Sequence, residues 1–192
     1  MTNATTITYQ DKDGIQQTMD VDLTDRTHRA ITPFCFHQVK KLWWVLDADW
    51  VWFDGRRIII FRRGFGWDGA SAPSLVWWYE SPGEHLAASG PHDSIYTFHW
   101  VEIWDCEQRI WIVVRANKAY TDQLFFDILT YYYKVDVIKT STMWSAVCVF
   151  GWYAWYTGNC RGKCAKCKAS VGTDCPYRDH IPPISTKWEL TA

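Results

Sequence analysis

The pair Asp54-Gly55, placed between two apolar segments, constrains the fold of this chain more than any other short feature. Trp43 to Phe53 precedes the pair and Ile58 to Arg63 follows it, and both segments are rich in residues that favour strands. Because Asp-Gly suits the tight turn of a β-hairpin, the sequence predicts a hairpin here. The run Ile58-Ile59-Ile60 further predicts that the second strand is buried on both faces.

The remaining patterns predict a second hairpin and several helices. Residues 5–22 flank the turn Asp-Lys-Asp-Gly, which predicts an N-terminal hairpin. Helices are expected from Pro73 to Trp78, through His92 to about Phe98, from roughly Ile112 to Tyr133, and from a cap at Ser141 or Thr142 to near Gly158. Strands first and helices after predict the α+β class, with N-terminal β-hairpins packed on about three α-helices.

Length and composition indicate one globular unit with an appendage. The 192 residues are 48% apolar and 21% charged, which suits a single buried core. We expect residues 1–158 to form one α+β domain. Residues 159–192 hold four cysteines and several Lys and Arg residues, and they are interpreted as a Cys-rich tail that is a candidate zinc knuckle.

Charge and hydropathy limit the partners that the chain can have. The formal net charge of −1 gives no strong signal for nucleic acid. The polar start lacks a basic end followed by an apolar run, and no stretch reaches the roughly 18 to 20 apolar residues of a membrane span. The apolar segment Met143 to Gly158 is therefore interpreted as a buried helix. The 14 Trp, 10 Tyr and 9 Phe residues fit either a core of large side chains or an interface for a partner.

Four of the seven cysteines have the spacing of a metal site. Cys160, Cys164, Cys167 and Cys175 lie within sixteen residues, and thiolates with short spacers suit tetrahedral zinc. The alternative is that these are free thiols on a tail. An odd number of cysteines argues against a disulfide framework.

A glycine-rich loop and a His-Asp pair form the candidate active site. The loop runs from Gly64 to Pro73 and contains Gly66 and Asp68, and the sequence His92-Asp93-Ser94-Ile95-Tyr96 follows it. On a helix His92 and Tyr96 share a face, and Asp122 on a neighbouring helix would hold the tautomer of a His92 general base.

The residue next to His92 has a separate expected role, and a purely structural interpretation also stays open. Asp93 points away from His92 and is free to bind a cation together with carbonyls of the loop. In the structural interpretation His92, Tyr96 and Asp122 form a buried polar network, and the loop glycines serve only a tight turn. Pro91 predicts a break before His92, which would place the imidazole at a positive helix N-terminus that lowers its pKa.

These motifs resemble a family of phage and prophage proteins of unknown function. The family is marked by a Gly-Phe-x-x-Asp-Gly-Ala-Ser-x-Pro loop followed by a helix with His-Asp-x-x-Tyr, and the likeness covers roughly residues 55 to 157. The resemblance implies that the protein is phage-encoded, acting in the host cytoplasm or the virion, and supplies no activity.

A looser resemblance is to calcium-dependent secreted phospholipases. It implies that His92 is the base that activates water against an ester, that Asp122 orients it and that Tyr96 supports it, with Phe125 packing beside them. It also implies a calcium ion held by Asp93 and by the loop at Gly64, Gly66 and Asp68. Trp67, Trp77, Trp78 and Trp100 could then form a lipid-facing rim.

Two classes of function therefore stay open. The first is a small esterase-like or phospholipase-like hydrolase with a metal-assisted water, whose partner is a lipid or ester substrate. The second is a non-enzymatic virion or accessory protein that binds a phage structural protein. The first predicts an accessible His92 within hydrogen-bond reach of Asp122, and the second predicts that both residues are sealed from solvent.

Overall fold

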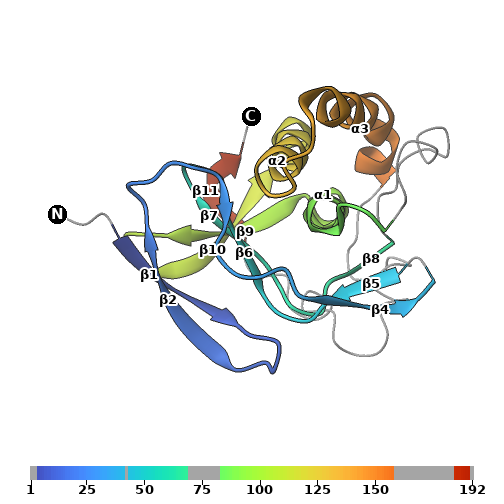
Figure 1. The fold of residues 1–192 in the computed structure, drawn as a ribbon. Coiled ribbons are helices and arrows are strands. Elements are labelled where there is room, and N and C mark those ends of the chain that lie inside the picture. The colour runs from blue at the N-terminus through green and yellow to red at the C-terminus, as the bar shows by residue number, and fades with distance from the viewer. Residues whose placement is uncertain (1–3, 42, 69–82, 158–183, 191–192) are drawn as a thin grey trace.

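The computed structural model describes residues 4–41, 43–68, 83–157 and 184–190. The fold belongs to the α+β class, as predicted. The strands are β1 Ala4–Gln10, β2 Gln16–Asp22, β3 Arg29–Ala30, β4 Phe36–Lys40, β5 Trp43–Leu46, β6 Trp50–Phe53, β7 Ile58–Phe61, β8 Gly66–Trp67, β9 Trp100–Asp105, β10 Ile110–Ala116 and β11 Ile184–Leu190. The helices are α1 Leu86–Phe98, α2 Lys118–Tyr131 and α3 Val137–Thr157, and they gather on one side of the central sheet (Figure 1).

The central sheet has the strand order β11-β10-β9-β7-β6-β3, and the predicted Asp54-Gly55 hairpin lies within it. Strand β6 pairs antiparallel with β7, and Phe53 lies opposite Ile58 across the turn. Gly55 has a φ of 79°, and a Cβ there would come 2.6 Å from the carbonyl oxygen of Arg26. Glycine is therefore required at this turn, both for its backbone conformation and for close approach.

The two faces of the β6–β7 hairpin enter different cores, which is why its residues are apolar in succession. Trp50, Trp52, Ile59 and Phe61 pack on the helix side. On the other face Val51, Phe53, Ile58 and Ile60 pack against the predicted N-terminal hairpin β1–β2, which contributes Ile7 and Val21. The prediction that Ile58 to Ile60 are buried on both faces is confirmed, since none is more than 2% exposed.

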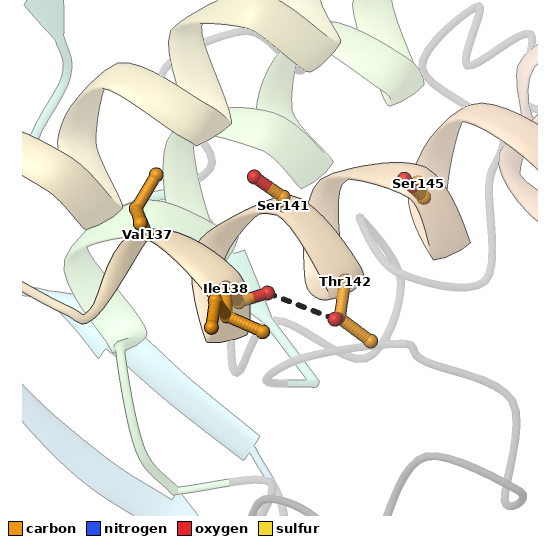
Figure 2. Close-up of a pocket in the computed structure, with 5 residues that line it drawn as sticks. All are labelled: Val137, Ile138, Ser141, Thr142 and Ser145. Carbon is orange, nitrogen blue, oxygen red and sulfur yellow. Dashed lines mark hydrogen bonds between the residues drawn. The ribbon is translucent and has the colours of Figure 1, made fainter.

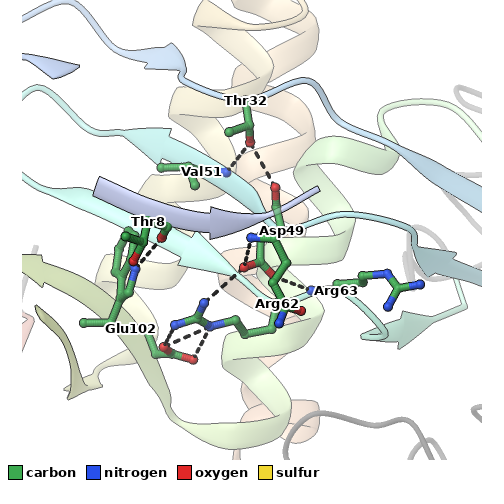
Figure 3. Close-up of polar contacts among 9 residues, drawn as sticks. Thr8, Thr32, Asp49, Val51, Arg62, Arg63 and Glu102 are labelled. Carbon is green, nitrogen blue, oxygen red and sulfur yellow. Dashed lines mark hydrogen bonds and ion pairs between the residues drawn. The ribbon is translucent and has the colours of Figure 1, made fainter. Parts of the chain in front are cut away.

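A network of hydrogen bonds and ion pairs surrounds Arg62 on the face of the sheet that packs against the β1–β2 hairpin (Figure 3). The Arg62 guanidinium binds the Glu102 carboxylate through Nε, at 3.0 Å to each oxygen, and through Nη2, and it donates to Asp49 Oδ2 at 3.1 Å. The Asp49 carboxylate also accepts from the backbone N–H groups of Gln10 and Arg63. The carboxylates of Asp49 and Glu102 are buried, so the guanidinium and the backbone donors replace water for them.

The predicted long helix from Ile112 to Tyr133 is wrong in its first part. Residues up to Ala116 form β10, which pairs antiparallel with β9, and only Lys118–Tyr131 is helical. The β-branched run Ile112-Val113-Val114 is paired by its neighbour strand, a tertiary contact that overrides helical periodicity. Asn117 separates the two elements, since its side chain accepts the N–H of Tyr120 at 2.8 Å and caps α2.

Two other predicted boundaries are also wrong. The segment from Trp43 to Phe53 is two strands, and β5 belongs to a separate three-stranded sheet of order β4-β5-β8. The last helix begins at Val137, because Asp136 accepts the N–H of Ile138 at 2.9 Å, so Ser141 and Thr142 lie inside α3.

The order of elements differs from strands followed by helices. Strands β9 and β10 lie between α1 and α2, and residues 184–190 of the expected tail form β11, parallel to β10 at the sheet edge. The expected helix from Pro73 to Trp78 lies outside the described residues.

Pro91 does not break the helix before His92. Helix α1 runs continuously from Leu86 to Phe98 with Pro91 inside it. His92 is therefore an interior residue, and the expectation that it lies at a helix N-terminus is wrong. Leu86 to Thr97 are all buried, so the helix is held by packing, which outweighs the backbone hydrogen bond that proline cannot donate.

Candidate active site

The candidate site lies where α1 meets α2, and small residues let α1 approach its neighbours. A Cβ on Gly90 would lie 3.2 Å from the indole of Trp67, so glycine allows α1 to pack on β8. His92 and Tyr96 are one turn apart on α1, and Asp122 faces them from α2. The prediction that these three side chains come together is confirmed.

Asp122 is the centre of the cluster. Its Oδ1 accepts from Nε2 of His92 at 3.2 Å and from the hydroxyl of Tyr96 at 2.7 Å. Its Oδ2 accepts from Nζ of Lys118 at 2.6 Å. Burial raises the pKa of Asp122, but the hydrogen bonds from His92, Lys118 and Tyr96 outweigh burial and lower that pKa to about 2. The carboxylate is therefore ionised at neutral pH.

The imidazole of His92 is enclosed on several sides. Its ring centroid lies 4.1 Å from that of Tyr96 and 5.2 Å from that of Phe125. Nδ1, the nitrogen that Asp122 does not bind, lies 3.8 Å from Oδ1 of Asp93, so the expectation that Asp93 points away from His92 is wrong. His92 is 8% exposed and Asp122 is 3% exposed. His92 is therefore within hydrogen-bond reach of Asp122, as an enzyme requires. Its imidazole is not accessible to solvent, which an enzyme would also require.

The pKa of His92 is raised, which corrects the expectation that a helix terminus lowers it. Burial by itself lowers this pKa, because it disfavours the charged ring. The hydrogen bond to Asp122 and the negative charges of Asp122 and Asp93 outweigh burial, so the protonated imidazolium is stabilised between two carboxylates.

Lys118 is a member of the cluster that the sequence interpretation missed. Besides Asp122, its Nζ donates to the carbonyl oxygens of Val147 at 3.2 Å and Cys148 at 3.1 Å, and so ties α2 to α3. The signal was present, because Lys118 and Asp122 are four residues apart and share a helix face. Only the hydrogen bonds from Lys118 to the carbonyl groups of α3 depend on the tertiary fold.

Two glycines of the loop, Gly64 and Gly66, have structural roles. Gly64 has a φ of 86°, and its N–H donates to the carbonyl of Leu46 at 2.8 Å. Gly66 lies in β8, where a Cβ would come 3.0 Å from Nε1 of Trp43. The start of the loop therefore turns and pairs with β5, and Asp68 follows directly after β8.

Metal ligands do not gather in the described part of the chain. No group of three or more His, Cys, Asp or Glu side chains is placed there to hold an ion. Calcium at Asp93, Gly64, Gly66 and Asp68 remains a prediction. Cys160, Cys164, Cys167 and Cys175 lie outside the described residues, so zinc also remains one. Cys35, Cys106 and Cys148 are free thiols.

The prediction of a lipid-facing rim is wrong for Trp67 and Trp100, the two of its four residues that the structure describes. Trp67 is fully buried and Trp100 is 5% exposed, because both pack in the core beside α1. Trp77 and Trp78 lie outside the described residues. In the part of the chain that the structure describes, no helix is long and apolar enough to cross a membrane.

Comparison with known protein families assigns this chain to a family but does not assign it a function. Residues 44–147, which are 104 of the 192 residues, match the family model described as protein of unknown function DUF1353. The chain therefore belongs to this uncharacterised family. No curated protein and no solved structure matches it.

Proposed function

We propose that this protein is a small ester hydrolase in which His92 is the general base and Asp122 orients it. The observation that carries the proposal is the hydrogen bond from Nε2 of His92 to an ionised Asp122, which leaves Nδ1 as the nitrogen that can take a proton from water. Tyr96 holds the same carboxylate oxygen. Helices α1 and α2 thus supply the base, its orienting acid and a supporting hydroxyl, the set that the likeness to secreted phospholipases implies.

In the proposed reaction His92 acts in its neutral form. The Asp122 carboxylate accepts the Nε2 proton, which fixes the tautomer with a bare Nδ1. That nitrogen removes a proton from a water molecule as the water attacks the ester carbonyl. The resulting imidazolium is stabilised by Asp122 and Asp93, and it returns the proton to the departing alcohol.

The proposed proton transfers need only His92 and Asp122 and no metal ion. Gly64 and Phe65 use backbone groups to pair with Leu46, so these groups are already engaged, and no three described His, Cys, Asp or Glu side chains are placed to hold an ion. Asp93 and Asp68 are the carboxylates to test if calcium stimulates the reaction. The phage origin, with action in the host cytoplasm or the virion, belongs to the same proposal and rests on the loop and His-Asp motifs.

A second candidate function is favoured by the burial of the cluster. His92 and Asp122 are almost sealed from solvent, and Lys118 neutralises the Asp122 charge while bonding to α3. Such a network can serve only to fix the packing of the three helices. The protein would then be a non-enzymatic virion or accessory component that binds a phage structural protein.

Hydrolysis of a fluorogenic phospholipid and of a short ester separates the two candidates. We expect turnover by the purified protein and a loss of about 10²–10⁴-fold in His92→Ala, the contribution typical of general base catalysis. The matched control is His37→Ala, which removes an exposed histidine that is also paired with an aspartate. Parallel assays with calcium and with a chelator test the metal.

The result that overturns the hydrolase is equally specific. If the wild-type protein turns over neither substrate with or without calcium, and His92→Ala only lowers the melting temperature by several degrees, the cluster is structural.

A further inference from the structure

The outer face of α3 carries large apolar side chains that the rest of the described chain leaves uncovered. Seven of them are between 55% and 74% exposed, namely Val137, Ile138, Val149, Phe150, Trp152, Tyr153 and Tyr156. The opposite face is packed, since Thr140 is fully buried and Met143 is 7% exposed. An uncovered apolar surface of this extent marks an interaction site.

Six exposed positions of α3 follow the spacing of a helix-pairing seam. They are separated by four, three, four, three and four residues, which keeps them in one narrow stripe when two helices pack side by side. We call this stripe the outer seam, and it consists of Ile138, Thr142, Ser145, Val149, Trp152 and Tyr156. It faces away from α2, because Thr140, Met143 and Val147 lie on the other side of the helix.

The N-terminal half of the outer seam is hollowed, whereas its C-terminal half is bulky. Val137, Ile138, Ser141, Thr142 and Ser145 line a groove of about 490 Å³ (Figure 2). The hydroxyl of Thr142 donates to the carbonyl oxygen of Ile138 at 2.8 Å, so it needs no further partner. The small side chains of the N-terminal half thus leave space for large side chains such as those of the C-terminal half.

We propose that a second copy of this chain docks antiparallel on the outer seam of α3. An antiparallel pair with a twofold axis midway between Ser145 and Val149 places Trp152 of each copy opposite Thr142 of the other. It also places Tyr156 opposite Ile138, and Val149 opposite Ser145. Every large seam residue beyond the axis then meets the groove or Ile138, as an isologous interface requires.

Area and charge both suit this occupant. The seam residues Ile138, Val149, Trp152 and Tyr156 are all more than half exposed, and side chains of this size supply much of the about 800 Å² per partner that a standard interface buries. Lys139 is the one charged residue of α3 and lies off the seam, so no like charges oppose each other. Antiparallel helices also set each positive N-terminus beside a negative C-terminus.

Sedimentation velocity of the full chain in reducing buffer tests the proposal, and the reductant removes disulfide-linked species. We expect the mass of two 22.5 kDa chains at micromolar concentration. Val149→Glu places two carboxylates beside the twofold axis and should weaken the pairing about 30-fold or more. The matched control is Phe150→Glu, which changes an equally exposed side chain rotated about 100° from Val149 and should leave the pairing intact.

A double variant tests the direction of pairing. In the antiparallel arrangement Ser145→Lys and Val149→Glu in one chain bring lysine opposite glutamate twice, so the double variant should pair again where Val149→Glu alone does not. In a parallel arrangement like charges would meet, and pairing would stay lost. Far-UV circular dichroism should match the wild type for every variant, because these side chains are exposed.

Several results would overturn the proposal. One is a single-chain mass for the wild type at every micromolar concentration. A second is pairing that Val149→Glu and Phe150→Glu weaken equally. A third is binding of the single chain to vesicles of zwitterionic and anionic phospholipid that requires Trp152, because the seam would then contact lipid.

Discussion

Two buried polar clusters of the described residues lie on opposite sides of the central sheet, and they differ in whether their charges can change. On the β1–β2 side, Arg62 lies between the carboxylates of Asp49 and Glu102. On the helix side, Asp122 accepts from His92, Tyr96 and Lys118. A guanidinium stays charged at any physiological pH, whereas an imidazole can lose its proton. The first cluster is suited to holding the sheet, and the second is also suited to moving a proton.

The two clusters also differ in which parts of the molecule they join. The Arg62 network joins the β1–β2 hairpin to the sheet, because Asp49 accepts from Gln10 at 2.9 Å and Trp111, whose ring lies under the Arg62 guanidinium, donates to Thr8 at 2.7 Å. The Asp122 cluster joins three helices through Lys118. A change in either cluster should therefore destabilise a different boundary of the molecule.

The largest expected loss of stability comes from Arg62→Ala. Removing the guanidinium leaves two buried carboxylates without their cation, which should cost about 3–5 kcal/mol in the free energy of unfolding. Urea denaturation measures this cost. The neighbouring Arg63→Ala is the control, since that side chain is exposed and its backbone bond to Asp49 is kept, and it should cost less than about 1 kcal/mol. Equal costs for the two variants would contradict the role given to Arg62.

The variant Asp122→Asn sharpens the difference between the clusters. It keeps the shape of the side chain but removes the charge that His92 and Lys118 face, and should cost about 1–3 kcal/mol. Activity should fall by far more than the folded fraction does, because the tautomer of His92 is no longer fixed. A hydrolysis rate per folded molecule equal to that of the wild type would remove Asp122 from the mechanism.

A smaller effect is expected for Tyr96→Phe. It deletes one hydrogen bond to Asp122 and leaves the bonds of His92 and Lys118 in place, so the expected cost is about 1 kcal/mol. The change should lower the rate only modestly, because the base and its orienting acid remain. A loss as large as that of His92→Ala would make the hydroxyl a direct participant.

The smallest effect is a difference in pH dependence. The folded-state pKa of His92 is raised above 6.5, so its stabilising contribution is fully present below 6.5 and is lost as the pH rises through that pKa. Hydrolysis should change in the opposite direction and increase with pH, since the neutral imidazole is the base. Unfolding free energies across neutral and mildly alkaline pH should show a steeper decline for the wild type than for His92→Gln. If the unfolding free energies of the wild type and of His92→Gln change in parallel with pH, His92 does not titrate in this pH range.

The sequence was enough to predict the elements that depend on interactions between neighbouring residues. Asp54-Gly55 predicted the β6–β7 hairpin, and the run of three isoleucines predicted a strand with two buried faces. The spacing of His92 and Tyr96 placed both on one helix face, and Asp122 was found by its place in a second helical pattern. These features depend on turn geometry and residue periodicity, which act over a few residues.

Contacts between distant residues decided the rest. Ile112 to Val114 became a strand because β9 offers it a partner, although their pattern also fits a helix. Glu102 meets Arg62 from forty residues away, and Lys118 reaches carbonyls of α3. The burial of His92 and the exposure of the outer seam likewise depend on which surfaces the packed layers cover. The sequence by itself determined the local elements and the candidate residues, whereas the tertiary structure decided their partners and solvent access, because both depend on atoms brought together only by the fold.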